Sequence, residues 1–147
     1  MFVGFSTNLT YKDWSFGFVL RGSFNNYVYN NVYSNIGRLN QAIGGPFISN
    51  ISSNYLTTQF KGTTDQQLLS DYYLENASFL KMDNLNVGYN VGQILKNKAT
   101  LQLSATVQNV FVITKYTGLD PEISNGVDNN LYPRPRIYAL GINLHFQ

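Results

Sequence analysis

Hydrophobic and polar residues alternate along most of the chain, and this two-residue period is typical of half-buried β-strands. The pattern is clearest where Leu85, Val87 and Tyr89 alternate with asparagine and glycine. Helical periodicity is almost absent. The alternation predicts five strands, over residues 2–11, 14–24, 79–91, 99–109 and 136–146.

The connections between these predicted strands alternate in length. Lys12 and Asp13 make a short turn, whereas residues 25–76 and 110–135 form long connections. Outer-membrane barrels combine short periplasmic turns with long outside loops, and a tilted strand needs about 10 residues to cross the bilayer. The layout therefore favours an antiparallel transmembrane β-barrel segment over a soluble β-sandwich, whose strands also alternate.

The apolar faces of the predicted strands carry aromatic residues near their ends. Tyr11 and Trp14 flank the first turn, Phe146 ends the last strand, and Phe24 and Tyr138 lie at the opposite strand ends. Such rings form the aromatic girdles of membrane barrels. Arginine or lysine on a lipid-facing surface at mid-bilayer costs roughly 2–4 kcal/mol, and these apolar faces hold no charge at that depth.

One stretch departs from this pattern. Lys81 and Asp83 share the parity of Leu85, which would place two charges on the apolar face. We expect this segment either to rise above the membrane or to contain a β-bulge, which shifts the following side chains to the opposite face.

The opposite faces of the later strands are lined by amides and hydroxyls. Soluble surfaces are normally built from Lys, Glu, Arg and Asp, so neutral polar residues indicate a polar lumen instead. The predicted lumen-facing residues are Asn84, Asn86, Asn90, Gln102, Ser104, Thr106, Gln108 and Asn143.

Composition narrows the possible functions. The 147 residues include 10 basic and 8 acidic side chains, 11 Tyr, 10 Phe and no cysteine. There is therefore no disulfide framework or thiolate metal site, and the net charge of +2 gives no reason to expect a nucleic-acid partner. No apolar run of about 18 residues predicts a transmembrane helix, and no signal peptide opens the sequence, so we expect an export signal upstream.

The sequence contains no catalytic constellation, so we expect neither an enzyme nor a cofactor. His145 is the single histidine and is interpreted as a solvated lumen residue. Asp120, Glu122 and Asp128 supply the oxygen ligands that calcium prefers. Their spacing does not match an EF-hand, and the Asp-Pro and Asn-Gly pairs nearby are turn signals, so calcium is the weaker alternative.

Tyrosines are frequent in the long connections. Tyr29, Tyr33 and Tyr55 lie in the first and Tyr116 in the second. Aromatic rings beside asparagine amides suit contact with a sugar or with a covering partner protein. The alternative is packing within the loop, which we favour because a connection as long as 25–76 rarely lacks structure of its own.

Five strands cannot close a barrel. Closed outer-membrane barrels of this kind have an even number of strands, at least 8, and open edges in lipid are very costly. Residues 1–147 are therefore predicted to be part of a larger barrel. The last strand resembles the C-terminal signal of barrel assembly, which places the segment at the C-terminal end of its parent, although Gln147 follows the final aromatic residue. The predicted assembly signal comprises Tyr138, Leu140, Ile142, Leu144 and Phe146.

Three sequences suggest a family when they are taken in order: "ENASFLKMDNLNVGYNV", "SATVQNVFVITKYTGLDPE" and "YPRPRIYALGINLHF". Together they resemble the C-terminal end of SusC/RagA-type TonB-dependent outer-membrane transporters of Bacteroidota. The resemblance covers residues 71–146 well, whereas residues 1–70 fit only in layout. It implies a 22-stranded barrel with an N-terminal plug, of which this chain supplies the last five strands and the last two long outside loops.

The resemblance implies TonB-energised import of oligosaccharides or peptides across the outer membrane. The expected partners are the remaining barrel and plug, a SusD-like surface lipoprotein acting as a lid, TonB through the missing N-terminal part, outer-membrane lipid and the glycan or peptide substrate. Two alternatives stay open: a passive outer-membrane porin segment, and a soluble carbohydrate-binding β-sandwich.

Overall fold

The computed structural model describes residues 1–36, 53–57, 69–94, 98–129 and 132–146. The chain divides into two compact units, which we call the sheet unit and the loop unit. The sheet unit comprises Met1–Phe24, Phe79–Thr114 and Arg134–Gln147. The loop unit comprises Asn25–Ser78 and Lys115–Pro133.

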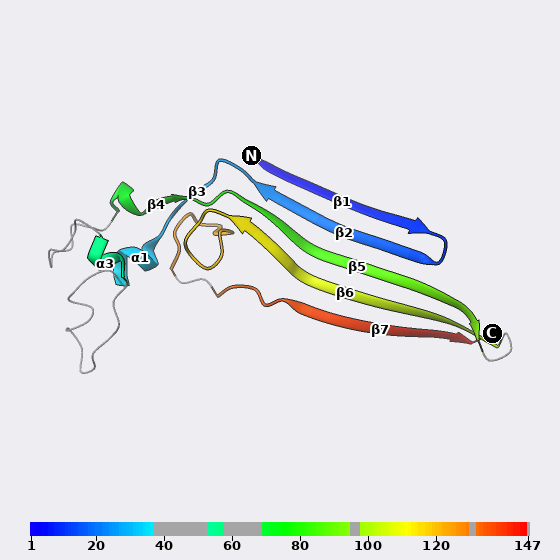
Figure 1. Cartoon of the computed structure of the whole chain (residues 1–147). Coiled ribbons are helices and arrows are strands. Elements are labelled where there is room, and N and C mark those ends of the chain that lie inside the picture. Colours follow the sequence, from blue (N-terminus) through cyan, green and yellow to red (C-terminus); the bar gives the residue numbers. More distant parts are fainter. Residues whose placement is uncertain (37–52, 58–68, 95–97, 130–131, 147) are drawn as a thin grey trace, which may run out of the picture. The chain divides into compact units, whose positions relative to one another are not determined.

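The sheet unit is a five-stranded antiparallel sheet with the strand order β1-β2-β5-β6-β7 (Figure 1). The expected all-β antiparallel fold class is confirmed. Both β5 and β6 have 16 residues and run past the predicted ends at 91 and 109. The strands are β1 (Phe2–Tyr11), β2 (Trp14–Ser23), β5 (Phe79–Ile94), β6 (Ala99–Thr114) and β7 (Ile137–Phe146).

A bulge at Asp83 interrupts β5. Val19 of β2 pairs with Asn84, but the next residue, Leu20, pairs with Met82, so Asp83 is the extra residue. The register between β5 and β6 shifts at the same place. The expected bulge is thus present, and alternation within β5 changes phase across it.

The bulge removes charge from the apolar face. Lys81 pairs directly with Arg21 of β2 and so lies on the polar face, while Leu80 pairs with Gly22 and Ile113 on the apolar face. Directly paired residues in antiparallel strands have side chains on the same face of the sheet. Strict alternation back from Leu85 puts Lys81 on the apolar face. The extra residue Asp83 reverses the alternation, so Lys81 lies on the polar face instead.

The loop unit has secondary structure of its own. Strand β3 (Tyr27–Tyr29) pairs antiparallel with β4 (Leu74–Asn76). The N–H of Tyr29 donates to the Gly126 carbonyl and its own carbonyl accepts from the Asp128 N–H, both at 2.9 Å, forming a parallel bridge at Val127. The other described elements are α1 (Asn31–Ile36), α3 (Asn54–Thr57) and the 3-10 helix η2 (Asp71–Tyr73).

A small hydrophobic core stabilises the loop unit. Val28, Ala77 and Tyr116 are buried together, and Ile123 packs against them. These residues come from both long connections, so the two connections share one core. Within the described ranges, none of the helices has the length and apolar character needed to span a membrane.

Candidate functional site

The strand registers place all eight predicted lumen residues on one face of the sheet. Paired positions in β5 and β6 carry amides or hydroxyls, and the Thr106 hydroxyl donates to Asn86 Oδ1 at 2.8 Å. Across β6 and β7, Gln102 pairs with Asn143. The face therefore presents neutral hydrogen-bonding groups. Its members are Asn84, Asn86, Asn90, Gln102, Ser104, Thr106, Gln108 and Asn143.

Glycines make this polar face close-packed. Gly88 and Gly141 flank Ser104 in the register, and a Cβ on Gly141 would lie 2.5 Å from the Ser104 hydroxyl oxygen. Beside them, towards the Lys12–Asp13 turn, lies a hollow of about 370 Å³, lined in part by Asn90 and Gln102. His145 also lies on this face, opposite Thr100.

An ion pair occupies the bulge. The Arg21 guanidinium donates from Nη2 to Asp83 Oδ1 at 2.9 Å and from Nε to Oδ2. Lys81, paired with Arg21 across the strands, is only 5% exposed. The charges near the bulge thus concentrate on the polar side of the sheet.

The opposite face of β7 is apolar and open. Leu140 is 89% exposed and Ile142 73% exposed. Large contiguous apolar surfaces are rare on monomeric soluble proteins and indicate contact with another apolar phase or partner. The residues of the predicted assembly signal, all exposed and all on this face, are Tyr138, Leu140, Ile142, Leu144 and Phe146.

Aromatic rings cluster on the apolar face beside the first turn. The Trp14 and Tyr89 ring centroids are 4.6 Å apart, and Trp14 stacks on Phe16 with 5.9 Å between centroids. Tyr11 is the cross-strand partner of Trp14. Amphipathic rings of this kind are enriched where a membrane meets water.

A polar network centred on Asn30 joins the two connections within the loop unit. Asn30 is 1% exposed, and its Nδ2 donates to Glu75 Oε1 at 2.8 Å and to Thr117 Oγ1 at 3.3 Å. Its Oδ1 accepts from the Tyr33 N–H at 3.0 Å, which satisfies an otherwise unpaired donor at the start of α1. Glu75 also accepts from the Thr117 N–H at 3.0 Å.

A second buried pair lies nearby. The Tyr116 hydroxyl donates to Asp128 Oδ2 at 2.7 Å, and the two residues are 6% and 3% exposed. Burial, and then the hydrogen bond to Asp128, raises the pKa of the Tyr116 phenol above its usual range. A Cβ on Gly118 would lie 2.7 Å from Asp128 Oδ2, so only glycine fits this turn without displacing the pair.

Tyr116 should resist ionisation at alkaline pH. An unfolded tyrosine ionises near the ordinary pKa of 10.0, whereas the folded Tyr116 stays neutral there because its pKa is raised. The contribution of Tyr116 to the free energy of unfolding is fully present below pH 10.0. It is lost as the pH rises above 10.0 and through the raised pKa of the folded state, because the unfolded state then ionises first. In the intact protein labelled with carbon-13 at the tyrosine rings, the Tyr116 resonance, assigned as the one absent from Tyr116→Phe, should keep its chemical shift past pH 10.0. A change of that chemical shift centred at pH 10.0 in the folded protein would contradict the burial of Tyr116.

The four tyrosines predicted as loop contacts occupy different environments. Tyr29 is 8% exposed, donates its hydroxyl to Ser34 Oγ at 3.0 Å and packs edge-on against Tyr73. Tyr29 and Tyr116 are therefore internal to the loop unit, and for them the packing interpretation applies rather than surface contact. Tyr33 and Tyr55 are half-buried and retain accessible surface.

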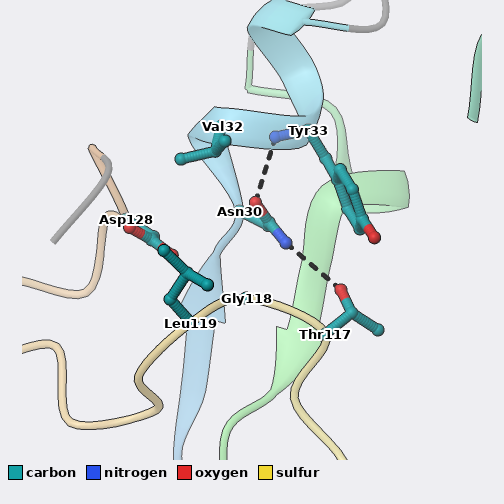
Figure 2. Close-up of a pocket in the computed structure, with 7 residues that line it drawn as sticks. All are labelled: Asn30, Val32, Tyr33, Thr117, Gly118, Leu119 and Asp128. Atoms are coloured by element: carbon teal, nitrogen blue, oxygen red, sulfur yellow. Dashed lines mark hydrogen bonds between the residues drawn. The ribbon is translucent and has the colours of Figure 1, made fainter. Parts of the chain in front are cut away.

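Tyr33 lines a cavity of about 180 Å³ within the loop unit. Figure 2 shows Asn30 at its centre, with the Tyr33 ring on one side and Val32 and Leu119 on the other. Sequence reasoning missed most of this pocket because its walls come from segments far apart in the chain. Of its lining residues, the sequence analysis had singled out Tyr33 as a loop contact and Asp128 as a calcium candidate. The lining residues are Asn30, Val32, Tyr33, Thr117, Gly118, Leu119 and Asp128.

The calcium candidates are not gathered into a metal site. Asp120 Oδ1 accepts from the Glu122 N–H at 2.9 Å, a local turn contact, while Asp128 holds the Tyr116 hydroxyl. In the part of the chain that the structure describes, no three His, Cys, Asp or Glu residues form a group that could hold a metal ion.

Comparisons with curated proteins relate the chain to TonB-dependent receptors. It is 40% identical over 152 residues to TonB-dependent receptor SusC of Bacteroides thetaiotaomicron, which covers 98% of this chain and 15% of that protein. It is 24% identical over 163 residues to TonB-dependent receptor P39 of Formosa agariphila, covering 97% and 16%. The chain thus spans about one sixth of the length of these relatives or less. No protein-family model matches it.

Solved structures show the same fold. The RagAB peptide transporter matches with a TM-score of 0.73 and 24% identity, over 96% of this chain and 17% of that chain. The RagAB peptide importer in the closed-closed state matches with a TM-score of 0.72, also at 24% identity, over 97% and 17%. The named relatives are receptors and transporters rather than enzymes.

Proposed function

We propose that this chain, which is 40% identical to TonB-dependent receptor SusC over 98% of its own length, forms part of the wall and outside loops of an outer-membrane, TonB-energised importer. Its strands would be the last five of the barrel. The observation that supports this most directly is the separation of two faces on the same strands, one lined by neutral amides and one apolar and open.

The apolar face fits lipid. Leu140 and Ile142 are exposed in the chain by itself and would be buried by acyl chains in the membrane. The outer edges of β1 and β7 carry backbone groups that need partners, because unpaired N–H and C=O groups in lipid cost several kcal/mol each. In this proposal, strands from the remainder of the receptor supply those partners.

The polar face fits a water-filled or plug-filled lumen. Asparagine and glutamine offer both donors and acceptors, so side chains such as Asn86 and Gln102 can exchange bonds among water, plug and a passing solute. Passage requires contacts weak enough to release the solute. A neutral amide surface supplies such contacts without a fixed charge.

The substrates we propose are oligosaccharides or peptides. The homology to SusC and the shared fold with the RagAB peptide importer support this range. A SusD-like surface lipoprotein would cover the outside, and TonB would act through a part of the receptor beyond this segment. In this scheme the segment itself performs no catalysis.

Energised uptake separates the proposal from the passive-pore alternative. Cells carrying the intact receptor should take up radiolabelled maltooligosaccharides or a mixed peptide digest, and a protonophore should abolish that uptake. Deleting the receptor gene is the control for uptake by other routes. Receptor-dependent uptake that persists unchanged with protonophore would favour a passive porin.

The isolated segment should not fold in detergent-free buffer. Residues 1–147 expressed alone would expose an apolar face and two open strand edges, which favour aggregation. Size-exclusion chromatography and a thermal melt provide the test, with the same chain in detergent micelles as the control. A monodisperse, detergent-free monomer with a cooperative melt would support the soluble carbohydrate-binding sandwich instead.

A further inference from the structure

We propose that one end of the polar face binds the carboxylate group of a solute, at a site formed by Gly4, Arg21 and Lys81. Arg21 pairs with Gly4 of β1 on one side and with Lys81 of β5 on the other, so the three residues form one row on this face of the sheet. The inference rests on the proposed function and deepens it, because it names a chemical group by which the importer would recognise part of its substrates.

Charge within the strands of the sheet unit is confined to this one place. Arg21, Lys81 and Asp83 are the only Asp, Glu, Lys or Arg residues within the five strands described for that unit. Charged side chains are costly in membrane-spanning segments, and those that are kept usually face a polar interior and mark the pathway of a substrate or ion. The three residues therefore indicate a function on the lumen side of the sheet.

The site carries more positive than negative charge. Arg21 and Lys81 are directly paired, and like charges in that position destabilise a sheet. Asp83 compensates one of them, because it accepts hydrogen bonds from Arg21 Nε and, at 2.9 Å, from Arg21 Nη2. Arg134, which precedes β7 in the same unit, adds a further positive charge that acts electrostatically on Asp83. A second carboxylate would relieve the repulsion among these cations.

Open space lies beside Arg21 on the polar face. A Cβ added to Gly4 would have no heavy atom within 4 Å apart from those of its chain neighbours. The Arg21 and Asp83 side chains are 25% and 23% exposed, so the ion pair can be reached from the lumen, whereas Lys81 is only 5% exposed. A carboxylate placed above Gly4 would therefore contact Arg21, and Lys81 would act on it through its charge.

A carboxylate is the group that this arrangement suits. A guanidinium carries five N–H donors in a planar fork that matches the two oxygens of a carboxylate. Arg21 already holds one carboxylate, that of Asp83, through two of these donors. Among the substrates proposed above, peptides carry a carboxylate at their C-terminus, and acidic oligosaccharides carry one on each uronic acid unit. Neutral solutes would pass the row without this contact.

The position of the row suits an early step of import. Arg21 lies two residues before the end of β2 and Lys81 two residues after the start of β5, at the end of the sheet from which the first long connection leaves. In the proposed barrel this is the outside end, so a solute would meet the cations before the neutral amides. Asp83 competes with the solute for Arg21, which keeps the binding weak enough for release.

Two matched pairs of ligands test the inference on the intact, detergent-solubilised receptor. Acetyl-dialanine is compared with its C-terminal amide, and the methyl glycoside of glucuronic acid with that of glucose, so each pair represents one source of the carboxylate. Saturation-transfer NMR titrations measure the affinities. We expect the acid of at least one pair to bind roughly tenfold more tightly than its neutral counterpart, because charge-assisted hydrogen bonds are the stronger ones. Added salt should reduce this preference.

Three substitutions should change the preference for the acid in different directions. Lys81→Gln removes a positive charge without touching the Arg21–Asp83 pair, and the preference should fall to within about twofold. Asp83→Asn removes the resident negative charge, and the preference should rise at least about threefold. Gly4→Leu fills the open space and should reduce the preference as far as Lys81→Gln does. The matched control is Lys98→Gln, which removes the same charge beside the opposite end of the sheet and should leave the preference unchanged.

Equal binding of acid and neutral ligand in both pairs would overturn the inference, as would an acid preference that Lys81→Gln and Gly4→Leu both leave unchanged. The competing explanation of the excess charge is a carboxylate supplied permanently by the remainder of the receptor. In that case Lys81→Gln would lower the level of the receptor in the outer membrane, because a carboxylate would lose its cation, and no acid preference would be observed. A preference in one pair alone supports the inference and identifies the peptide or the acidic sugar as the source.

The protonophore experiment described above can fail independently of this one. If uptake is sensitive to protonophore while the acid preference is absent, only the carboxylate site falls. If the preference follows the variants as expected while uptake is insensitive to protonophore, the site stands and the TonB-energised function fails.

Discussion

An intact receptor carrying Ile142→Arg should reach the outer membrane at a level at least about tenfold below that of the wild type, because arginine at mid-bilayer on a lipid-facing surface costs roughly 2–4 kcal/mol. Ile142 is 73% exposed on the apolar face of β7. Leu140→Arg should have the same effect for the same reason. Immunoblotting of separated outer membranes measures the level directly.

Asn143→Arg is the matched control. Asn143 follows Ile142 directly and so has nearly the same depth, but it pairs with Gln102 on the polar face. Its arginine would meet water or polar groups, and the level should stay within about twofold of wild type, since substitutions on the lumen side of barrels mainly tune selectivity. Equal loss for both substitutions would contradict the assignment of the faces.

Asn30→Asp should unfold the loop unit, including β3 and β4, while sparing the five strands of the sheet unit. The substitution is nearly isosteric and keeps the oxygen that accepts from the Tyr33 N–H, but it replaces two donated hydrogen bonds with a carboxylate facing Glu75. Losing a buried hydrogen bond to a charged group and gaining a like charge should cost the loop unit roughly 2–4 kcal/mol. Hydrogen exchange of the intact receptor should show lost protection in β3 and β4 and unchanged protection in β5 and β6.

A second substitution makes this test specific. Adding Glu75→Gln to Asn30→Asp restores a donor opposite the new carboxylate, while the remaining oxygen of the glutamine can still accept from Thr117. Protection in β3 and β4 should then return in large part, which is the coupling expected of residues in direct contact. If the double variant is no better protected than Asn30→Asp alone, the donor geometry is not what holds the two connections together.

The sheet was predictable because its signal is local. Alternation sets which residues share a face, and it identified the strands and the eight polar-face residues without any knowledge of pairing. Strict alternation assigns the wrong face to residues beyond a bulge, however, because the bulge adds one residue to the strand. Lys81 looked misplaced until the register showed Asp83 as an extra residue, and only an unexpected charge in the pattern hinted at it.

The loop unit was less predictable because its structure is held by distant contacts. One hydrogen-bond network joins Asn30, Glu75 and Thr117, which are far apart in the chain. No short sequence motif predicts contacts between residues so distant in sequence. Strand β3 and helix α1 are too short to have a periodicity of their own. The sequence shows that tyrosines are abundant in the long connections. Which of them are buried depends on the tertiary contacts of the loop unit.

The shared core of the loop unit constrains how such receptors can be recombined. Val28 and Ala77 come from the first connection and Tyr116 from the second, so neither connection retains its packing alone. A chimaera that exchanges only residues 25–78 with a relative would leave the native 115–133 without its partner surface. The two segments, separated in the sequence by β5 and β6, therefore form a single exchangeable module. Whether a substitution is tolerated in one segment depends on which residues the other segment carries.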